Sequence, residues 1–324
     1  MSLTLDDLFA SPDHYLHSFD GDAAVFVPMD RAAYHRSIFL DGRISPAADG
    51  SMALPVATLT QQKRGTAPTA WIFHMAHCGS TLLARALDDP GASLVLREPL
   101  ALRQTAIRPD AGRLALVLAM AAKRYRADAP TLVKANVPVN FLLPQLAAAD
   151  AGARAILLYL PLRAYLLAIL RSDNHRTWLR NVTGQLAPYL GDLSSLSDAE
   201  RAAALWLAQV DRFTKVLAAM PHARALDAEL FFTEPVAVLK MAARHLGVPI
   251  ADAVLEAAVA GPLFATYSKN PSLAFDNAAR IARRADVEQA IAPELDAAEA
   301  WVGRHAARSA PDAALAAAAL TRSG

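Results

Sequence analysis

The sequence predicts an α/β fold of three layers, in which one parallel sheet is flanked by helices on both faces. Short apolar segments alternate with longer amphipathic ones over most of the chain, and this alternation is typical of a sheet whose strands are buried on both sides. Hydrophobic residues make up 54% of the chain and charged residues 19%, a composition that excludes a disordered protein. The length of 324 residues is ample for a large core.

The predicted strands and helices follow one another in the order that such a sheet requires. The strands are short and apolar: WIFHM (71–75), SLVL (93–96), TLVK (131–134), RAILLYL (154–160) and ARALD (223–227). The helices are longer and amphipathic: one from Gly79 to Leu87, one near 111–126, one after Pro138, one from Pro161 to Arg171, one around 198–219 and one over 234–247. Crossovers between parallel strands are right-handed, and ligands bind at the carboxyl ends of the strands. A site is therefore expected just after residues 75, 97, 134 and 160.

Two further regions flank this core, which is predicted to cover residues 61–250. Residues 1–60 contain two short alternating runs, AAVFVPM (23–29) and RSIFLDGR (36–43), with turn dipeptides at 20–21 and 41–42. This pattern predicts a small N-terminal β-hairpin extension. Residues 251–324 are predicted to form a C-terminal loop and helices that pack on the core.

Charge and cysteine content restrict the possible partners and the compartment. The net charge is +1, from 32 basic and 31 acidic residues, so neither nucleic acid nor an anionic membrane is expected as a partner. The single cysteine, Cys78, excludes an internal disulfide and a cysteine-rich zinc site, and the histidines lack metal-ligand spacing, so no metal is expected. With no signal peptide and no apolar segment long enough to span a bilayer, the chain is predicted to be cytoplasmic.

The segment HCGST (77–81), after the first strand, has the composition of an anion-binding loop. Free N–H groups at a helix N-terminus, with the helix dipole behind them, bind phosphate-like groups, and Gly79 lets the backbone approach the anion. The Walker A pattern is matched only in part, because His74 replaces its first glycine and Ser80 its lysine. The alternative interpretation is that Gly-Ser-Thr only caps the helix.

A second interpretation of this loop concerns the thiol. The H-C-x5-R loop of cysteine-dependent phosphatases requires an arginine at position 84, but Ala84 stands there and Arg85 comes one residue late. One residue turns a side chain by about 100° around a helix. Cys78 is therefore expected to be a small loop residue whose thiol pKa is lowered by the helix N-terminus.

The loop and the segments after it resemble, in order, the sulfotransferases that use 3′-phosphoadenosine 5′-phosphosulfate (PAPS), and the motif order is nearest to the tyrosylprotein and bacterial branch. The loop of that family reads basic–small–Gly–Ser/Thr–Thr. The later segments that carry the resemblance are Arg97-Glu98-Pro99, the strand–lysine–helix–strand stretch 131–160, DAEL (227–230) and LGVP (246–249). The likeness covers about 71–249 and implies a P-loop-type fold.

The resemblance also implies a donor site, from which this chain departs at two places. Where the family has an arginine and a serine that hold the 3′-phosphate of PAPS, this chain has Leu160 and Ala168. The candidates to replace them are Arg163, Arg171 and Ser172, the last two one helical turn beyond Ala168. The glycine-rich basic loop of the family is absent, and the loop 265–276 with Lys269 stands in its place.

The resemblance implies transfer of a sulfuryl group from PAPS to a hydroxyl or amine of a small molecule or peptide, leaving 3′-phosphoadenosine 5′-phosphate (PAP). The amides of 78–81 with the Ser80 and Thr81 hydroxyls would hold the 5′-phosphate, and His77 or Lys134 would stabilise the leaving group. Glu98 is the candidate base, with a pKa raised by partial desolvation.

Several alternatives stay open at this stage. Glu98 could cap a helix or pair with Arg97 or Arg103, Lys134 could be solvated, and His175 is a weaker candidate for the base. The stripe of Arg171, Arg176 and Arg180 could be either a phosphate-facing wall or a solvated face. The alternative function is a non-catalytic or divergent P-loop nucleotide-binding protein, kinase-like or partner-binding. The sequence predicts no oligomeric state.

Overall fold

The computed structural model describes residues 3–62, 67–307 and 310–321. Its central sheet has five parallel strands in the order β5-β6-β4-β7-β8. Their bounds are β4 (Thr69–His74), β5 (Val95–Arg97), β6 (Thr131–Lys134), β7 (Arg154–Tyr159) and β8 (Ala223–Asp227). Every residue of β5 and β6 is buried, because helices cover both faces of the sheet. The predicted fold class is confirmed.

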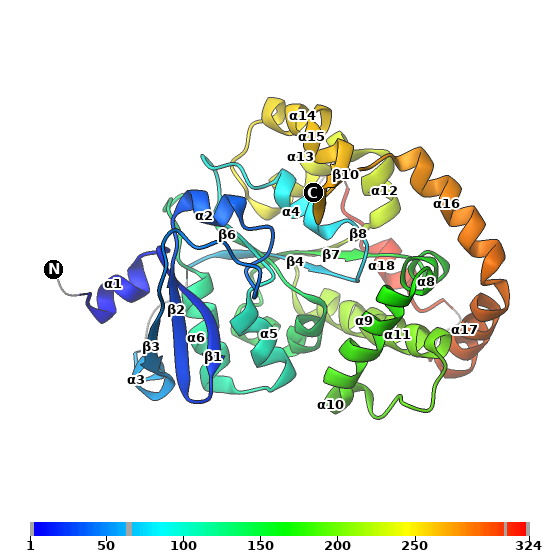
Figure 1. Ribbon diagram of the computed structural model, residues 1–324, viewed down its shortest axis with the longest axis horizontal. Coiled ribbons are helices and arrows are strands. Elements are labelled where there is room, and N and C mark those ends of the chain that lie inside the picture. The colour runs from blue at the N-terminus through cyan, green and yellow to red at the C-terminus, as the bar shows by residue number, and fades with distance from the viewer. Residues whose placement is uncertain (1–2, 63–66, 308–309, 322–324) are drawn as a thin grey trace.

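Helices cover both faces of this sheet and form the outer layers (Figure 1). One face carries α4 (Ser80–Ala86), α12 (Ala228–Thr233), α13 (Pro235–Leu246), α14 (Asp252–Ala260) and α15 (Pro262–Ala265). The other face carries α5 (Leu100–Ile107), α6 (Ala111–Ala121), η1 (Val137–Leu142), α7 (Leu143–Ala149), α9 (Asp173–Gln185), α10 (Ala187–Leu190) and α11 (Asp198–Ala219). The buried hydrophobic residues of the described chain form one cluster in space, whose members come from Leu8 to Leu320 in the sequence.

The helix predicted from Pro161 to Arg171 is separated by a break from the helix that carries Arg176 and Arg180. α8 (Leu162–Leu170) ends before Arg171, and α9 begins after Ser172, whose φ of −157° is extended. Arg171 and Ser172 therefore lie in a joint between two helices and not on the face of α8. The sequence-based assignment also missed α5 and α12.

The N-terminal region forms a three-stranded antiparallel sheet, β1 (His14–Asp20), β2 (Ala23–Pro28) and β3 (Met52–Pro55), with α1 (Leu5–Ala10), α2 (Arg31–Arg36) and α3 (Val56–Thr60). The predicted strand at 23–29 is present as β2, but its hairpin partner is β1, which the sequence analysis did not predict, and the turn between them contains Gly21 at φ +52°. The predicted strand at 36–43 is wrong. The carbonyl oxygens of Tyr34, His35 and Ser37 accept hydrogen bonds from the Arg97 guanidinium, and this network takes the place of a strand ladder.

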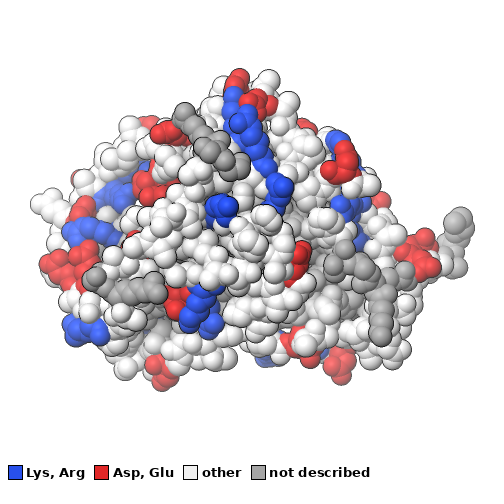
Figure 2. Space-filling view, turned by 180° about the vertical axis from the view of Figure 1, so that it is seen from behind, with Lys and Arg blue, Asp and Glu red and all other residues white. Residues whose placement is uncertain are grey.

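The C-terminal region adds a short hairpin and three helices. They are β9 (Thr266–Tyr267), β10 (Asn270–Ala274), α16 (Asn277–Ala290), α17 (Ala292–His305) and α18 (Ala313–Ala317). No described helix combines the length and the apolar character that crossing a bilayer requires. On the face shown in Figure 2, basic side chains lie beside acidic ones at several places, with large uncharged areas between them.

A buried ion pair attaches the N-terminal region to the sheet. The side chains of Arg97, at the end of β5, and Asp88 are each 1% exposed and paired, and Arg31 of α2 donates to Asp88 at 2.6 Å. Burial alone would raise the pKa of Asp88, but the hydrogen bond with His35 and the charges of Arg97 and Arg31 lower it to about 2.

We expect Asp88→Asn to lower the free energy of unfolding by about 3–5 kcal/mol at pH 7, because it leaves the Arg97 guanidinium buried without its anion. The pKa of Asp88 is depressed in the folded state, so its contribution is present above pH 4 and is lost as the pH falls towards about 2. Urea unfolding at several pH values would measure both effects.

Asp128→Asn is the matched control, because Asp128 also pairs with an arginine but its side chain is 67% exposed. We expect it to lower the free energy of unfolding far less than Asp88→Asn does, because solvent-exposed ion pairs contribute little to stability. Equal losses in the two variants, or a loss that does not shrink in acid, would contradict this account of the Asp88 site.

Candidate functional site

The loop between β4 and α4 is shaped by two residues with positive φ. His77 has φ +59° and Gly79 has φ +83°, and a Cβ at position 79 would lie 2.8 Å from Cζ of Phe232. The first backbone hydrogen bond of α4 runs from the Leu83 N–H to the Gly79 carbonyl oxygen, at 3.0 Å. The N–H groups of residues 80–82 precede it and have no partner inside the helix. The start of α4 thus has the backbone geometry of an anion-binding loop.

Glu98 and Lys134 meet beneath this loop, at the ends of the neighbouring strands β5 and β6. The Glu98 N–H donates to the Lys134 carbonyl oxygen at 2.8 Å. The Lys134 ammonium, fully buried, donates to Glu98 Oε1 and lies 3.4 Å from Thr81 Oγ1. Glu98 has φ +57°, an uncommon conformation for a residue with a side chain. Residues of a strand, a loop and a helix therefore meet at a single ion pair at the carboxyl ends of the strands.

The ion pair changes the pKa that the sequence predicted for Glu98. Burial alone would raise this pKa, but the Lys134 charge and those of His74 and Lys269 lower it to about 2. The expected upward shift is therefore wrong for the unliganded protein. The alternatives for these residues are also wrong: Lys134 is not solvated, and Glu98 pairs with neither Arg97 nor Arg103.

The His77 imidazole carries no charge at pH 7, and the pKa of the Cys78 thiol shifts in the direction opposite to the one predicted. Burial and the nearby charges of Lys269, His175 and Arg171 hold the pKa of His77 well below its usual range, so its imidazole is neutral at pH 7. Its ring lies 3.9 Å from that of His175, centroid to centroid. The Cys78 thiol donates to the Met75 carbonyl oxygen at 2.9 Å, and burial raises its pKa, contrary to the predicted lowering.

A cavity of about 550 Å³ opens in front of the loop. Its lining includes most of the residues predicted to bind a donor: His77, Cys78, Gly79, Ser80, Thr81, Arg171, Ser172 and Lys269. The joint between α8 and α9 supplies Arg171 and Ser172, and the β9–β10 hairpin supplies Lys269. The structure therefore brings together residues that are far apart in the sequence.

Three predicted basic residues lie elsewhere. Arg163 donates to Glu288 at 2.6 Å and to Glu299 at 2.8 Å. It lines neither this cavity nor the smaller cavity that adjoins it. Arg176 is paired with Glu294, and Arg180 with Asp198. Of the predicted stripe of arginines, only Arg171 faces the cavity.

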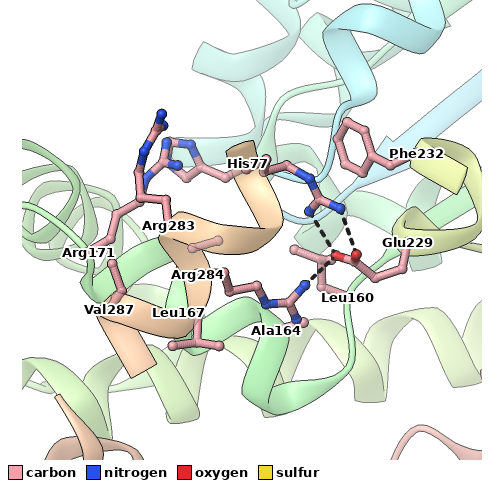
Figure 3. A pocket seen from close by; sticks show the side chains of 12 residues that line it. His77, Leu160, Ala164, Leu167, Arg171, Glu229, Phe232, Arg283, Arg284 and Val287 are labelled. Atoms are coloured by element: carbon pink, nitrogen blue, oxygen red, sulfur yellow. Dashed lines mark hydrogen bonds and ion pairs between the residues drawn. The ribbon is translucent and has the colours of Figure 1, made fainter. Parts of the chain in front are cut away.

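The structure adds basic residues that the sequence analysis missed. Arg280, Arg283 and Arg284 of α16 line a smaller adjoining cavity of about 80 Å³, together with Leu160 and Ala168 (Figure 3). Their spacing of i, i+3 and i+4 places them on one helix face, and this was the signal available in the sequence. In the described part of the chain, no group of three or more His, Cys, Asp or Glu side chains is arranged to hold a metal ion.

Comparison with known proteins finds solved structures that are similar to this chain, two of which are sulfotransferases. No protein-family model and no curated protein matches the chain. The sulfotransferase from Alicyclobacillus acidocaldarius is 12% identical, with a TM-score of 0.42 and coverage of 74% of this chain and 96% of that one. The sulfotransferase domain from the curacin biosynthetic pathway is 14% identical, with a TM-score of 0.42 and coverage of 65% and 84%.

We expect Gly79→Ala to destabilise the protein and to weaken anion binding at the loop. An alanine in the left-handed region costs about 1–2 kcal/mol, and its Cβ would also displace the Phe232 ring. Gly247→Ala is the matched control, because Gly247 is also left-handed, at φ +71° and ψ +26°, but the atom nearest to its Cβ would be Arg154 Nη1 at 3.9 Å, an ordinary van der Waals contact. Urea unfolding should show the larger loss for Gly79→Ala, and equal losses would contradict the close packing of Phe232 on the loop.

Proposed function

We propose that the protein is a sulfotransferase that transfers a sulfuryl group from PAPS to a hydroxyl or amine of a small-molecule or peptide acceptor, in the cytoplasm. The observation that carries the proposal is the buried Lys134–Glu98 pair directly beneath the anion-binding loop, with Thr81 in contact with Lys134. The cavity in front of that loop, about 550 Å³, has the size of a nucleotide-binding pocket.

The loop and Lys134 would bind and polarise the donor. The N–H groups at the start of α4 and the Ser80 and Thr81 hydroxyls would hold the 5′-phosphate. Sulfuryl transfer, like phosphoryl transfer, is in-line with a loose transition state, so positioned charge supplies most of the catalysis. The Lys134 ammonium lies 3.4 Å from Thr81 Oγ1, and it would stabilise the leaving phosphate. His77, which is neutral, would contribute a hydrogen bond and no charge.

Glu98 would accept the proton of the acceptor. In the reaction the acceptor oxygen or nitrogen forms a bond to sulfur, the bond from sulfur to the donor phosphate oxygen breaks, and the acceptor proton passes to the Glu98 carboxylate. The Lys134 charge holds the pKa of Glu98 at about 2, too low for an effective base. A donor anion beside Lys134 would offset that charge and raise the pKa, so Glu98 becomes basic when PAPS is bound.

A non-catalytic or divergent nucleotide-binding protein on the same scaffold is the second candidate. It is favoured by Leu160 and Ala168, which are apolar at the two places where the resemblance implies a grip on the 3′-phosphate. The two candidates share nucleotide binding at the loop and differ in the role of Glu98.

We expect PAP to raise the melting temperature of the full chain. A ligand at about 100 times its dissociation constant stabilises the folded state by about 2.7 kcal/mol. Thermal unfolding with PAP, compared with adenosine at the same concentration, would measure this effect. The absence of any shift at millimolar PAP would contradict both candidate functions.

We expect Glu98→Gln to lower the melting temperature of the unliganded chain, because it leaves Lys134 buried without an anion, and to keep an upward shift with PAP, whose phosphate supplies one. Sulfuryl transfer should fall by about 10²–10⁴-fold, as loss of a general base does. Transfer from PAPS to a panel of phenols, alcohols and amines would be followed as released PAP. Glu256→Gln, at a side chain 54% exposed on α14, is the control and should leave transfer unchanged. Transfer that survives Glu98→Gln would exclude Glu98 as the base, and normal PAP binding with no transfer by the unmodified chain would favour the non-catalytic candidate.

A further inference from the structure

The β9–β10 hairpin forms one wall of the larger cavity and carries Lys269 in its turn. The hairpin residues that line this cavity are Thr266, Tyr267, Ser268, Lys269, Asn270, Leu273 and Phe275. β10 pairs with β9 in a sheet of two strands, and every residue of β10 is exposed. Because burial does not fix this strand, the place of the turn depends on specific contacts with the rest of the chain.

The two ends of the hairpin are attached to the segments that precede and follow it. The Phe275 N–H donates to the Ala265 carbonyl oxygen at 2.8 Å, and the Phe275 ring lies 6.1 Å from that of Phe232, centroid to centroid. The Tyr267 hydroxyl accepts a hydrogen bond from Arg283 of α16 at 2.9 Å. These contacts hold residues 267 and 275 and leave the turn at 268–269 to be held in another way.

Arg85 supplies the contact that reaches the turn. Its Nη1 donates to the Ser268 carbonyl oxygen at 2.9 Å, across 183 residues of sequence. Arg85 is the arginine that comes one residue late for a phosphatase loop, and in the structure it points to the hairpin and lines neither cavity. Burial lowers the pKa of Arg85, so its guanidinium is partly desolvated, and a charge-assisted hydrogen bond is stronger in such a place.

The helix that carries Arg85 is fixed in the core. Arg85 lies in the last turn of α4, whose other residues are all buried: Ser80, Thr81, Leu82, Leu83, Ala84 and Ala86. A helix packed in this way moves little relative to the sheet. The hydrogen bond from Arg85 therefore fixes the turn of the hairpin relative to residues 77–81, which lie at the other end of the same helix.

The charge next to this turn acts on the candidate site. Burial is the largest cause of the low pKa of His77, and the Lys269 charge is the next cause. The same charge, together with the larger effects of Lys134 and His74, opposes the effect of burial on the pKa of Glu98. Coulomb interactions weaken with distance, so a shift of the turn by a few ångström would change the potential at the cavity.

We propose that Arg85 is a positioning residue, which holds the Ser268 carbonyl oxygen and thereby keeps Lys269 in the cavity wall, where Lys269 binds the anionic donor. The proposal rests on the proposed function, because it assumes that the donor occupies this cavity. Arg85 acts through Lys269 and does not touch the donor, because it lies outside the lining of both cavities.

Hydrogen exchange on the unliganded full chain tests the attachment of the hairpin. The unmodified chain should protect the amides of 266–276, and Arg85→Ala should speed their exchange about tenfold, as loss of one charge-assisted hydrogen bond does. Exchange in β4 and β7 should stay unchanged. Hairpin amides that are unprotected in the unmodified chain, or that exchange equally fast in Arg85→Ala, would overturn the attachment.

Arg154→Ala is the matched control for this experiment. The Arg154 guanidinium also donates to a distant backbone carbonyl oxygen, that of His245, at 3.0 Å, and Arg154 lines neither cavity. We expect Arg154→Ala to leave exchange of the hairpin unchanged. Faster hairpin exchange in this variant as well would mean that the hairpin responds to any loss of stability, and would overturn a specific role of Arg85.

Titration calorimetry with PAP tests the route through Lys269. Lys269→Ala should weaken PAP binding about tenfold, as loss of one charge-assisted contact does. Arg85→Ala should weaken it several-fold in the unmodified chain and have little further effect in the Lys269→Ala chain, because the lysine that it positions is gone. A merely structural role of Arg85 would weaken binding equally in both backgrounds, and that result would overturn the proposal.

The outcomes separate this proposal from the proposed function. Normal PAP binding by Lys269→Ala would overturn the role of Lys269 and of Arg85 and leave nucleotide binding at the loop intact. If PAP does not bind to the unmodified chain, the proposed function fails and the role of Lys269 fails with it. The exchange experiment uses no ligand, so it tests the attachment of the hairpin by Arg85 in either case.

Discussion

Burying a lysine ammonium costs several kcal/mol unless an anion and further acceptors meet it, and Lys134 is fully buried. Glu98 supplies the anion, and the Thr81 hydroxyl lies 3.4 Å away. Lys134 ends β6, Glu98 directly follows β5, and Thr81 lies in α4, the helix after β4, so the pair connects the ends of these strands to the start of α4. The arrangement of the loop, and with it every role proposed for the cavity, depends on this one interaction.

Two residues near this pair have strained backbone conformations, which the packing around them holds in place. The two non-glycine residues with positive φ in the described chain, His77 and Glu98, both lie at the candidate site. Each such conformation costs on the order of 1–3 kcal/mol and persists only where the surrounding structure holds it. The buried strands on either side, and the hydrogen bond from Glu98 to the Lys134 carbonyl, provide that support. Strain confined to these two positions is consistent with preorganisation of a site.

Those parts of the fold that depend on local patterns were predictable from the sequence. The bounds of β6, β8 and α11 match the predicted ranges, because apolar periodicity and caps act within a few residues. The segment 37–43 was not predictable in this way, since its conformation depends on Arg97, about 60 residues away. For the same reason the loop 77–81 was found as a motif, whereas the partner of Glu98 and its low pKa required the three-dimensional arrangement.

The small cavity beside the loop takes its positive charge from the joint after α8 and from α16. The residues are Arg171, Arg280, Arg283 and Arg284. Two positions that the resemblance makes polar, 160 and 168, are apolar here and form part of a cavity floor. In a sequence comparison they read as a lost site, yet the cavity they line contains more positive charge than one carboxylate can neutralise. A guanidinium group has long reach, so it can approach the same space from a different helix. The charge of a cavity therefore depends on the side chains that converge on it, and the strand or helix that carries them can vary.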